Sequence, residues 1–320
     1  MRIGVMIEGQ EAITWDRWFH ILDVAERLGY DSLWRSDHLF SVMGLSQRPT
    51  LALWPSLTAV GLKSQRLEFG QLVSPTTFRN PVMLAKEAVA LDHLSGGRYW
   101  LGLGAGWNER EHAAFGFDLP PLKDRMDRLE EALEVITLLW TGEPVSYAGR
   151  FFHLRDAQMQ PTPLEQGGGG VPLIIGGSGE KRLLSLVARF AGEWNCTVMP
   201  TERYAHKAQV LDQHCERVGR DPRTIARSIM MGHIVGRDQR ELEQRANWLK
   251  NFLPALKDRT PEEILQSRRE GGSLVGTPDE VVAQLQQLTQ LGVSRVMLQT
   301  FNLEDDAELD LIAQEVMPKV

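Results

Sequence analysis

The sequence predicts an α/β protein whose fold is a (β/α)8 barrel, or TIM barrel, with insertions. Short β-rich runs alternate with longer amphipathic segments along the chain. Eight such units divide the 320 residues into about 40 each, and eight parallel strands favour a closed barrel over an open sheet. No linker separates two equal halves, so residues 1–320 are expected to form a single domain.

The first half of the chain supplies four of the expected strands. Thr14 has the residue type of a helix N-cap and Gly29 that of a helix end, so a helix is expected between them. Ser95, Gly96 and Gly97 end a later helix. Strands are expected at residues 2–8, 32–35, 67–73 and 99–104, and helices at residues 14–29, 51–63, 81–94 and 122–141.

The alternation breaks at residues 144–163, where Gly149 and Arg150 stand between two β-like runs and predict a hairpin. Gln166 and the four glycines after it predict a flexible connector. The polar residues 257–272 are expected to form a second insertion, either mobile or a small helix.

The second half resumes the alternation and supplies the other four strands. Thr277 followed by Pro278 has the pattern of a capped helix start. Strands are expected at residues 173–175, 194–198, 225–235 and 293–299, and helices at residues 181–190, 201–218, 240–252 and 305–316 and from residue 277.

Composition and charge exclude several classes of protein. The 35 basic and 42 acidic residues give a net charge of −7 without a long basic run, which argues against a nucleic-acid partner. No window approaches eighteen unbroken apolar residues, so no membrane span is expected. Residues 1–5 lack the shape of a signal peptide, and Cys196 and Cys215 are expected to be buried free thiols, which predicts a cytoplasmic location.

The active site of such a barrel lies at the carboxyl ends of the strands. Polar, aromatic and glycine residues gather there and suit a flat conjugated ligand that carries a phosphate. The residues expected at this end are Glu8, Ser36, Asp37, His38, Ser74, Pro75, Thr76, Thr77, Gly104, Ala105, Gly106, Trp107, Asn108, Gly176, Gly177, Ser178, Gly179, Thr197, His233, Gln299 and Thr300.

Gly176, Gly177, Ser178 and Gly179 are the strongest local signal because they join an apolar strand to a helix. Glycines let backbone N–H groups turn inward, and the helix N-terminus adds partial positive charge, so a phosphate is the natural ligand. A tight turn without a ligand explains the same glycines. The spacing matches neither a P-loop nor a dinucleotide fingerprint.

Two further clusters are candidates for ring binding and proton transfer. Gly104 and its neighbouring glycines would let a planar ring lie against the backbone, and Asn108 could bond a hydroxyl or ring edge. His38 can titrate near neutral pH, with Asp37 beside it. The alternative is that Asp37 caps the next turn and that His38 only packs in the wall of a pocket.

The sequence lacks the motifs of several other types of catalysis. The sequence has no His-Glu-x-x-His, no cysteine pair at metal spacing and no nucleophile elbow, so no metal site is expected. A phosphate-binding aldolase or isomerase would need a lysine at a strand end, and no predicted strand ends in one.

Taken together in order, these motifs resemble the luciferase-like monooxygenase superfamily, in particular its branch that uses the deazaflavin coenzyme F420. The set is specific because its members follow the order and spacing of that family. The matching segments are residues 31–38, 78–86, 94–98, 102–111, 175–180 and 276–280.

The resemblance implies a homodimer and a flavin or deazaflavin over the strand ends, with its phosphate at the fifth strand. It implies a non-proline cis peptide near Gln71 and Leu72, with Leu72 behind the ring and Ser74 close to it. It places Asp37 near the ring edge. It also places Gly104, Asn108, Gly176, Gly177, Ser178 and Gly179 on the cofactor, and makes His38 a proton donor. Sugar-phosphate dehydrogenases of this family carry a carboxylate where this chain has Ala105, so that activity is not expected.

The leading hypothesis is an oxidoreductase that moves a hydride between F420 and a small organic substrate. The first alternative is an FMN-dependent luciferase-like monooxygenase. The second is a flavin-binding protein without turnover. The sequence does not identify the substrate.

Overall fold

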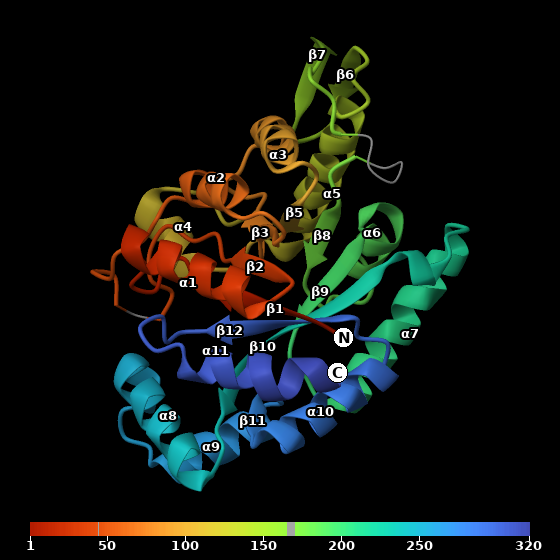
Figure 1. The fold of residues 1–320 in the computed structure, drawn as a ribbon. Helices are drawn as coiled ribbons and strands as arrows, with labels where there is room; N and C mark the ends of the chain where they lie inside the picture. Colours follow the sequence, from red (N-terminus) through yellow and green to blue (C-terminus); the bar gives the residue numbers. More distant parts are fainter. Residues whose placement is uncertain (44, 165–169) are drawn as a thin grey trace.

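The computed structural model describes residues 1–43, 45–164 and 170–320, in which eight parallel strands close into a ring (Figure 1). The ring strands are β1 (Arg2–Ile7), β2 (Ser32–Arg35), β3 (Glu68–Gln71) continued by β4 (Ser74–Pro75), β5 (Tyr99–Gly104), β8 (Leu173–Gly176), β9 (Glu193–Thr197), β10 (Ala226–Val235) and β12 (Arg295–Thr300). The pairing of β12 with β1, from Arg2 opposite Arg295 to Ile7 opposite Thr300, closes the sheet on itself. The predicted (β/α)8 barrel is therefore confirmed.

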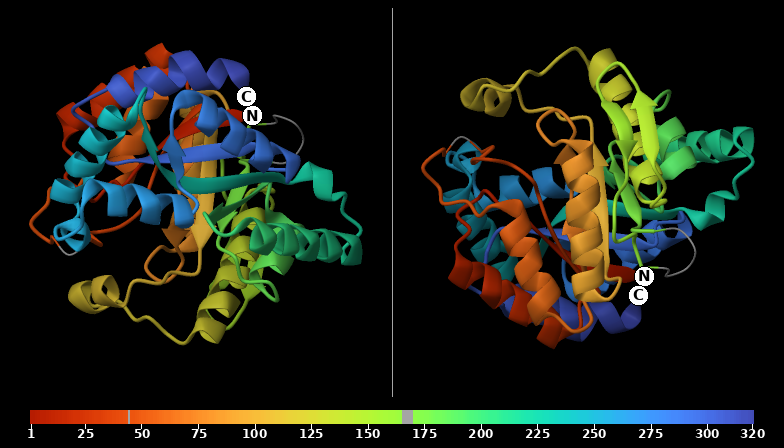
Figure 2. Two further views of the ribbon diagram at one scale, coloured as in Figure 1. Left: turned by 90° about the horizontal axis from the view of Figure 1, so that it is seen from below. Right: turned by 90° about the horizontal axis from the view of Figure 1, so that it is seen from above.

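Helices cover the outside of the ring (Figure 2). The predicted ends of the first helix are confirmed, because the side chain of Thr14 accepts a hydrogen bond from Arg17 N–H and Gly29 adopts a left-handed conformation. Within the described residues, no helix is long and apolar enough to cross a bilayer. The helices are α1 (Trp15–Leu28), α2 (Leu53–Lys63), α3 (Pro81–Ser95), α4 (Glu109–Phe115), α5 (Leu122–Leu139), α6 (Leu183–Phe190), α7 (Thr201–Arg217), α8 (Gln239–Phe252), α9 (Pro261–Glu270), α10 (Pro278–Gln290) and α11 (Ala307–Leu311).

Two insertions lie at opposite ends of the molecule in Figure 1. The antiparallel strands β6 (Val145–Ala148) and β7 (His153–Ala157) confirm the hairpin predicted at residues 144–163. Most of the second predicted insertion, residues 257–272, forms helix α9. The connector expected at residues 166–170 lies outside the described residues except for Gly170.

A short strand that was not predicted follows the second insertion. β11 (Leu274–Gly276) pairs in parallel with the last three residues of β10, beyond the part of β10 that belongs to the ring. Side chains of α8, α9 and β11, among them Leu242, Ile264 and Val275, pack into a small core of their own. The last part of β10 therefore supports a separate layer outside the barrel.

The third strand differs from the prediction. Residues 67–73 were expected to form one strand, but β3 ends at Gln71, and the cis peptide bond joins Leu72 to Val73. The expected position, near Gln71 and Leu72, is one residue too early. The reason is that regular pairing with β2 continues up to Gln71, opposite Arg35, so the irregularity begins only after it.

A buried ion network fills the amino-terminal end of the barrel. The guanidinium of Arg295 lies 5.2 Å from the ring centroids of both Trp34 and Trp100. It contacts Glu68 at 2.5 Å and Glu193 at 3.5 Å. Glu193 is fully buried, and burial raises the pKa of its carboxyl group although the charge of Arg295 opposes this effect. Arg295 is therefore the cation that makes the buried carboxylate of Glu193 tolerable.

We predict that Arg295→Leu lowers the free energy of unfolding by about 3–5 kcal/mol, because it leaves Glu193 buried without a cation. Denaturant titration followed by circular dichroism measures this change. Arg2→Leu is the control, since Arg2 pairs with Glu68 from a side chain that is 43% exposed, and it should cost less than about 1 kcal/mol. Equal effects of the two substitutions would contradict the interpretation.

Candidate functional site

A cavity of about 450 Å3 opens at the carboxyl ends of the strands. Seven of the residues predicted to form the site line it, namely Asp37, His38, Leu72, Asn108, Gly176, Gly177 and Ser178. Glu8, Glu111, Cys196, Met230 and Gln299 also line it. Residues on or just after all eight ring strands thus meet around one hollow, as expected for the barrel.

A second hollow of about 660 Å3 adjoins the cavity and shares Val73, Trp107 and Gly177 with it. The predicted residues Gly104 and Gly179 line this second hollow rather than the first. Lys123 and Lys181 also line it, which favours an anionic group there. The two hollows together form a continuous groove over the tips of β5 and β8.

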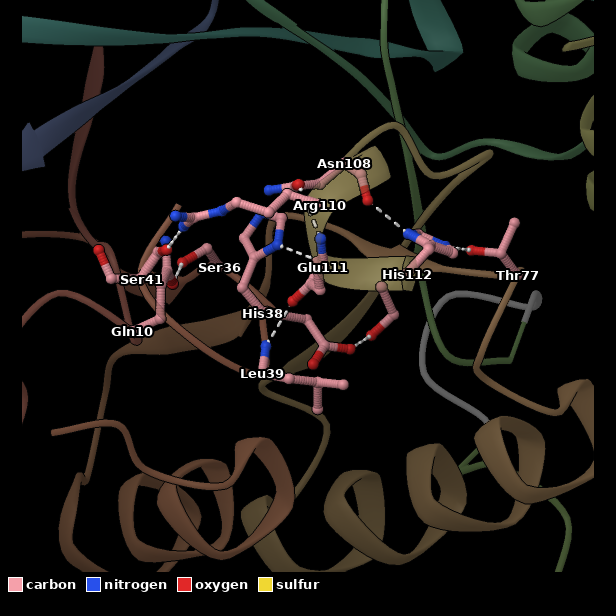
Figure 3. Close-up of polar contacts among 12 residues, drawn as sticks. Gln10, Ser36, His38, Leu39, Ser41, Thr77, Asn108, Arg110, Glu111 and His112 are labelled. Atoms are coloured by element: carbon pink, nitrogen blue, oxygen red, sulfur yellow. Dashed lines mark hydrogen bonds and ion pairs between the residues drawn. The ribbon is translucent and has the colours of Figure 1, made fainter. Parts of the chain in front are cut away.

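His38 forms an ion pair with Glu111 inside the cavity (Figure 3). Its Nδ1 lies 2.8 Å from Glu111 Oε2, and because an ionised carboxylate only accepts, Nδ1 carries the hydrogen. Nε2 has no hydrogen-bond partner among the described residues. Burial lowers the pKa of His38, but the hydrogen bond and charge of Glu111, with Glu8 and Asp37, outweigh it, so the pKa is raised.

Helix α4 holds Glu111 in this position. Asn108 caps the helix, with its side-chain oxygen accepting a hydrogen bond from Glu111 N–H at 3.1 Å. Glu111 Oε1 also accepts from the backbone N–H of Leu39 at 2.5 Å. The sequence analysis predicted Asn108 but missed Glu111. An asparagine followed three residues later by glutamate marks a helix start, and this is the signal that could have found Glu111.

The negative charge of Asp37 is balanced by a residue that follows the third strand. Arg79 donates to its two oxygens at 2.6 and 2.9 Å, and Ser74 Oγ donates to it at 2.6 Å. Ser74 is fully buried and is not among the residues that line the cavity, so its hydroxyl supports Asp37 from behind. Arg79 belongs to a segment that carried the resemblance, although the analysis gave it no role in the site. Asp37 is thus a fixed, paired charge at the cavity wall.

The glycine loop after β8 is held by neighbours on both sides. Gly177 N–H donates to Asn195 O at 2.9 Å, and its carbonyl accepts from Trp194 Nε1 at 2.8 Å. The buried Lys207 donates from Nζ to Ser178 O at 2.7 Å. In the part of the chain that the structure describes, no acceptor is found for the N–H groups of Ser178 and Gly179. These two donors, rather than Gly177 N–H, are therefore available to an anion.

Glycines of β5 and β8 pack closely against the third strand. A Cβ at Gly104 would lie 2.6 Å from Val73 Cγ2, and one at Gly176 would lie 2.9 Å from Val73 Cγ1. A Cβ at Gly102 would lie 1.9 Å from the carbonyl oxygen of Gln71. The glycines thus make room for the third strand.

Comparison with known proteins identifies the family of this chain. The model of the luciferase-like monooxygenase family matches residues 1–295. The chain belongs to this family. The resemblance inferred from the motifs is therefore confirmed.

Two curated relatives illustrate the similarity. The F420-dependent glucose-6-phosphate dehydrogenase of Amycolatopsis mediterranei is 27% identical over 316 residues, 92% of each chain. The F420-dependent hydroxymycolic acid dehydrogenase of Mycobacterium tuberculosis is 28% identical over 82% of this chain and 70% of its own.

Solved structures share the fold. An F420-dependent secondary alcohol dehydrogenase, in complex with an F420–acetone adduct, has a TM-score of 0.82 at 20% identity over 100% of this chain and 98% of its own. The monooxygenase RslO1 of Streptomyces bottropensis also has a TM-score of 0.82, at 19% identity over 99% of each chain.

We predict that Glu111→Gln lowers the pKa of His38, because burial would then no longer be outweighed by the hydrogen-bonded carboxylate. The ring would lose its proton at lower pH than in the unmodified protein. An NMR titration of the His38 ring measures the change. The control is Glu109→Gln, an exposed carboxylate on the same helix, which should leave the titration in place. An unchanged titration in Glu111→Gln would show that another group holds the proton.

Proposed function

We propose that this chain is an oxidoreductase that moves a hydride between coenzyme F420 and a small organic substrate. The observation that carries the proposal is a cavity lined both by His38 and by Ser178, whose backbone N–H has no acceptor among the described residues. The names of the curated relatives support the cofactor, because those described above are both F420-dependent dehydrogenases.

The residues present fit a phosphorylated, flat cofactor. The unpaired N–H groups of Ser178 and Gly179 would hold its phosphate, since the backbone amides of a glycine-rich loop that leads into a helix bind anions. Leu72 and Val73, which line the cavity at the irregular third strand, would support the ring. When bound, F420 supplies a ring carbon that gives or accepts a hydride.

His38 would move the proton that accompanies this transfer. Its Nδ1 is occupied by Glu111, which leaves Nε2 for a substrate oxygen. A neutral Nε2 can take the proton of an alcohol as it is oxidised, and the imidazolium can return it in the reverse direction. The Glu111 carboxylate fixes the ring and stabilises the charged form.

Glu8 supplies a carboxylate to the cavity although Ala105 removes the one found in sugar-phosphate dehydrogenases. Gln10 donates to Glu8 at 2.8 Å and Gln299 donates to it at 2.6 Å. Glu8 is nearly buried and forms no ion pair in the described part of the chain. Its position suits a hydrogen bond to a substrate hydroxyl.

The same proposal includes several finer statements. Residues 1–320 would act as one catalytic domain, as a cytoplasmic homodimer, on a small-molecule substrate. Light scattering measures the oligomeric state directly. An FMN-dependent monooxygenase and a flavin-binding protein without turnover are the other outcomes of the tests below.

The cofactor is tested by titrating F420 and FMN separately and recording fluorescence quenching. We expect F420 to bind, and Gly177→Asp to weaken its binding by several-fold or more because a carboxylate would stand beside the phosphate. Gly177→Ala is the control, since it imposes the same backbone cost at φ 133° without the charge. Binding of FMN alone would overturn the choice of cofactor, and equal affinities in the two variants would remove the phosphate assignment.

His38→Ala should leave the dissociation constant of F420 nearly unchanged and lower kcat by about 100-fold or more, the usual contribution of a positioned acid or base. A substrate panel followed by F420 absorbance provides the measurement. His206→Ala, which removes an exposed histidine, is the control. Normal turnover in His38→Ala would exclude His38 from proton transfer.

A further inference from the structure

Each backbone carbonyl of the glycine loop, residues 177–180, accepts a hydrogen bond from a group outside the loop. The donors are Trp194 Nε1 for Gly177, Lys207 Nζ for Ser178, Leu184 N–H for Gly179 and His214 Nε2 for Glu180, at distances from 2.7 to 3.1 Å. None of these four donor residues lines the cavity or the second hollow. The loop is therefore held from a side that faces neither of them.

These contacts fix the direction of the loop's N–H groups. In a trans peptide the carbonyl of one residue and the N–H of the next point in opposite directions, and no bond of this loop is among the cis bonds of the structure. The bond from Trp194 to Gly177 O therefore turns Ser178 N–H the other way. In the same manner, the bond from Lys207 to Ser178 O turns Gly179 N–H the other way. These are the two N–H groups for which the described residues offer no acceptor.

One face of helix α7 provides most of this support. Lys207 and His214 lie seven residues apart, two turns of the helix, so they share a face. Tyr204, one turn before Lys207, stacks on the ring of Trp194 with centroids 5.5 Å apart and an angle of 8° between the planes. The helix thus contacts the loop directly through two side chains and indirectly through Trp194.

Lys207 is the charged member of this set. It is only 4% exposed, and besides Ser178 O its Nζ donates to Glu180 Oε1 at 2.7 Å. Glu180 lines the second hollow, and the hydrogen bond and charge of Lys207 lower the pKa of its carboxyl group. A buried ammonium adds little to stability, since an apolar side chain of similar volume often serves as well. The position of Lys207 therefore indicates a role in the loop rather than in the core.

We propose that Lys207 is a positioning residue for the phosphate of the cofactor. Through the carbonyl oxygen of Ser178 it directs the N–H of Gly179 toward the phosphate, and by pairing with Glu180 it limits the repulsion between that carboxylate and the phosphate. Lys207 itself does not touch the cofactor, because it lines neither hollow. The inference rests on the proposed function for the identity of the molecule that carries the phosphate.

The first test needs no cofactor and follows the amide signals of Ser178 and Gly179 by NMR during a titration with inorganic phosphate. We expect both signals to shift in the unmodified protein, and Lys207→Met to weaken phosphate binding by about tenfold or more, because a charge-assisted contact is lost. Arg203→Met removes an exposed charge from the same helix and is the control, which should bind as the unmodified protein does. Signals that do not respond to phosphate, or equal affinities with and without Lys207, would overturn the inference.

A double variant separates the orientation of the loop from the charge of Glu180. Glu180→Gln leaves the contact of Lys207 with Ser178 in place, so phosphate should bind at least as tightly as before. Lys207→Met combined with Glu180→Gln should still bind more weakly than Glu180→Gln alone, since Ser178 O has lost its donor. Equal binding by these two variants would show that only the charge of Glu180 matters, and the orienting role would be wrong.

The third test compares F420 with the same deazaflavin lacking its phosphate, with fluorescence quenching as the measure of binding. Lys207→Met should raise the Kd of F420 by about tenfold or more and leave that of the phosphate-free compound nearly unchanged. An equal loss for both compounds would indicate a general structural role and would overturn the inference. Failure of the proposed function looks different: neither deazaflavin would bind the unmodified protein, while the Gly179 signal would still respond to phosphate.

Discussion

Val73 packs closely against two glycines, and the site depends on this contact. Its two methyl groups occupy the space that a Cβ of Gly104 or Gly176 would need. Because of this contact, the third strand lies close to the carboxyl ends of β5 and β8. Leu72 and Val73 therefore line the cavity. The glycine loop begins at Gly176, which is one of these two glycines. Packing therefore determines where a ring and an anion can lie relative to each other.

Two charged groups in the cavity, Asp37 and His38, each pair with an oppositely charged residue from another segment. Arg79 neutralises Asp37, and Glu111 neutralises His38 when the ring is protonated. The second pair depends on helix α4, whose cap is Asn108. A helix cap thus orients the proposed acid or base, which links local helix geometry to the chemistry of the site.

The fold was predictable because strand and helix patterns repeat with a constant order. The strand-end residues were predictable for the same reason, since the barrel topology brings all these ends together. The sequence did not reveal Glu111, Arg79 and Lys207 as site residues, because each acts through a contact between distant segments. β11 was missed because three residues are too few to show a period. The contact of Gly104 with Val73 could not be predicted, because the two residues are distant in the sequence.

Strand β10 belongs both to the barrel and to the layer outside it. Its first part pairs within the barrel, and its last three residues pair with β11 outside it. The layer built on that extension has a hydrophobic core of its own and contributes Arg245, Trp248 and Arg268 to the barrel mouth. Residues 239–276 thus form a layer of their own beside the barrel. A graft of this layer from a relative would alter the barrel mouth while the catalytic face of the enzyme keeps its architecture.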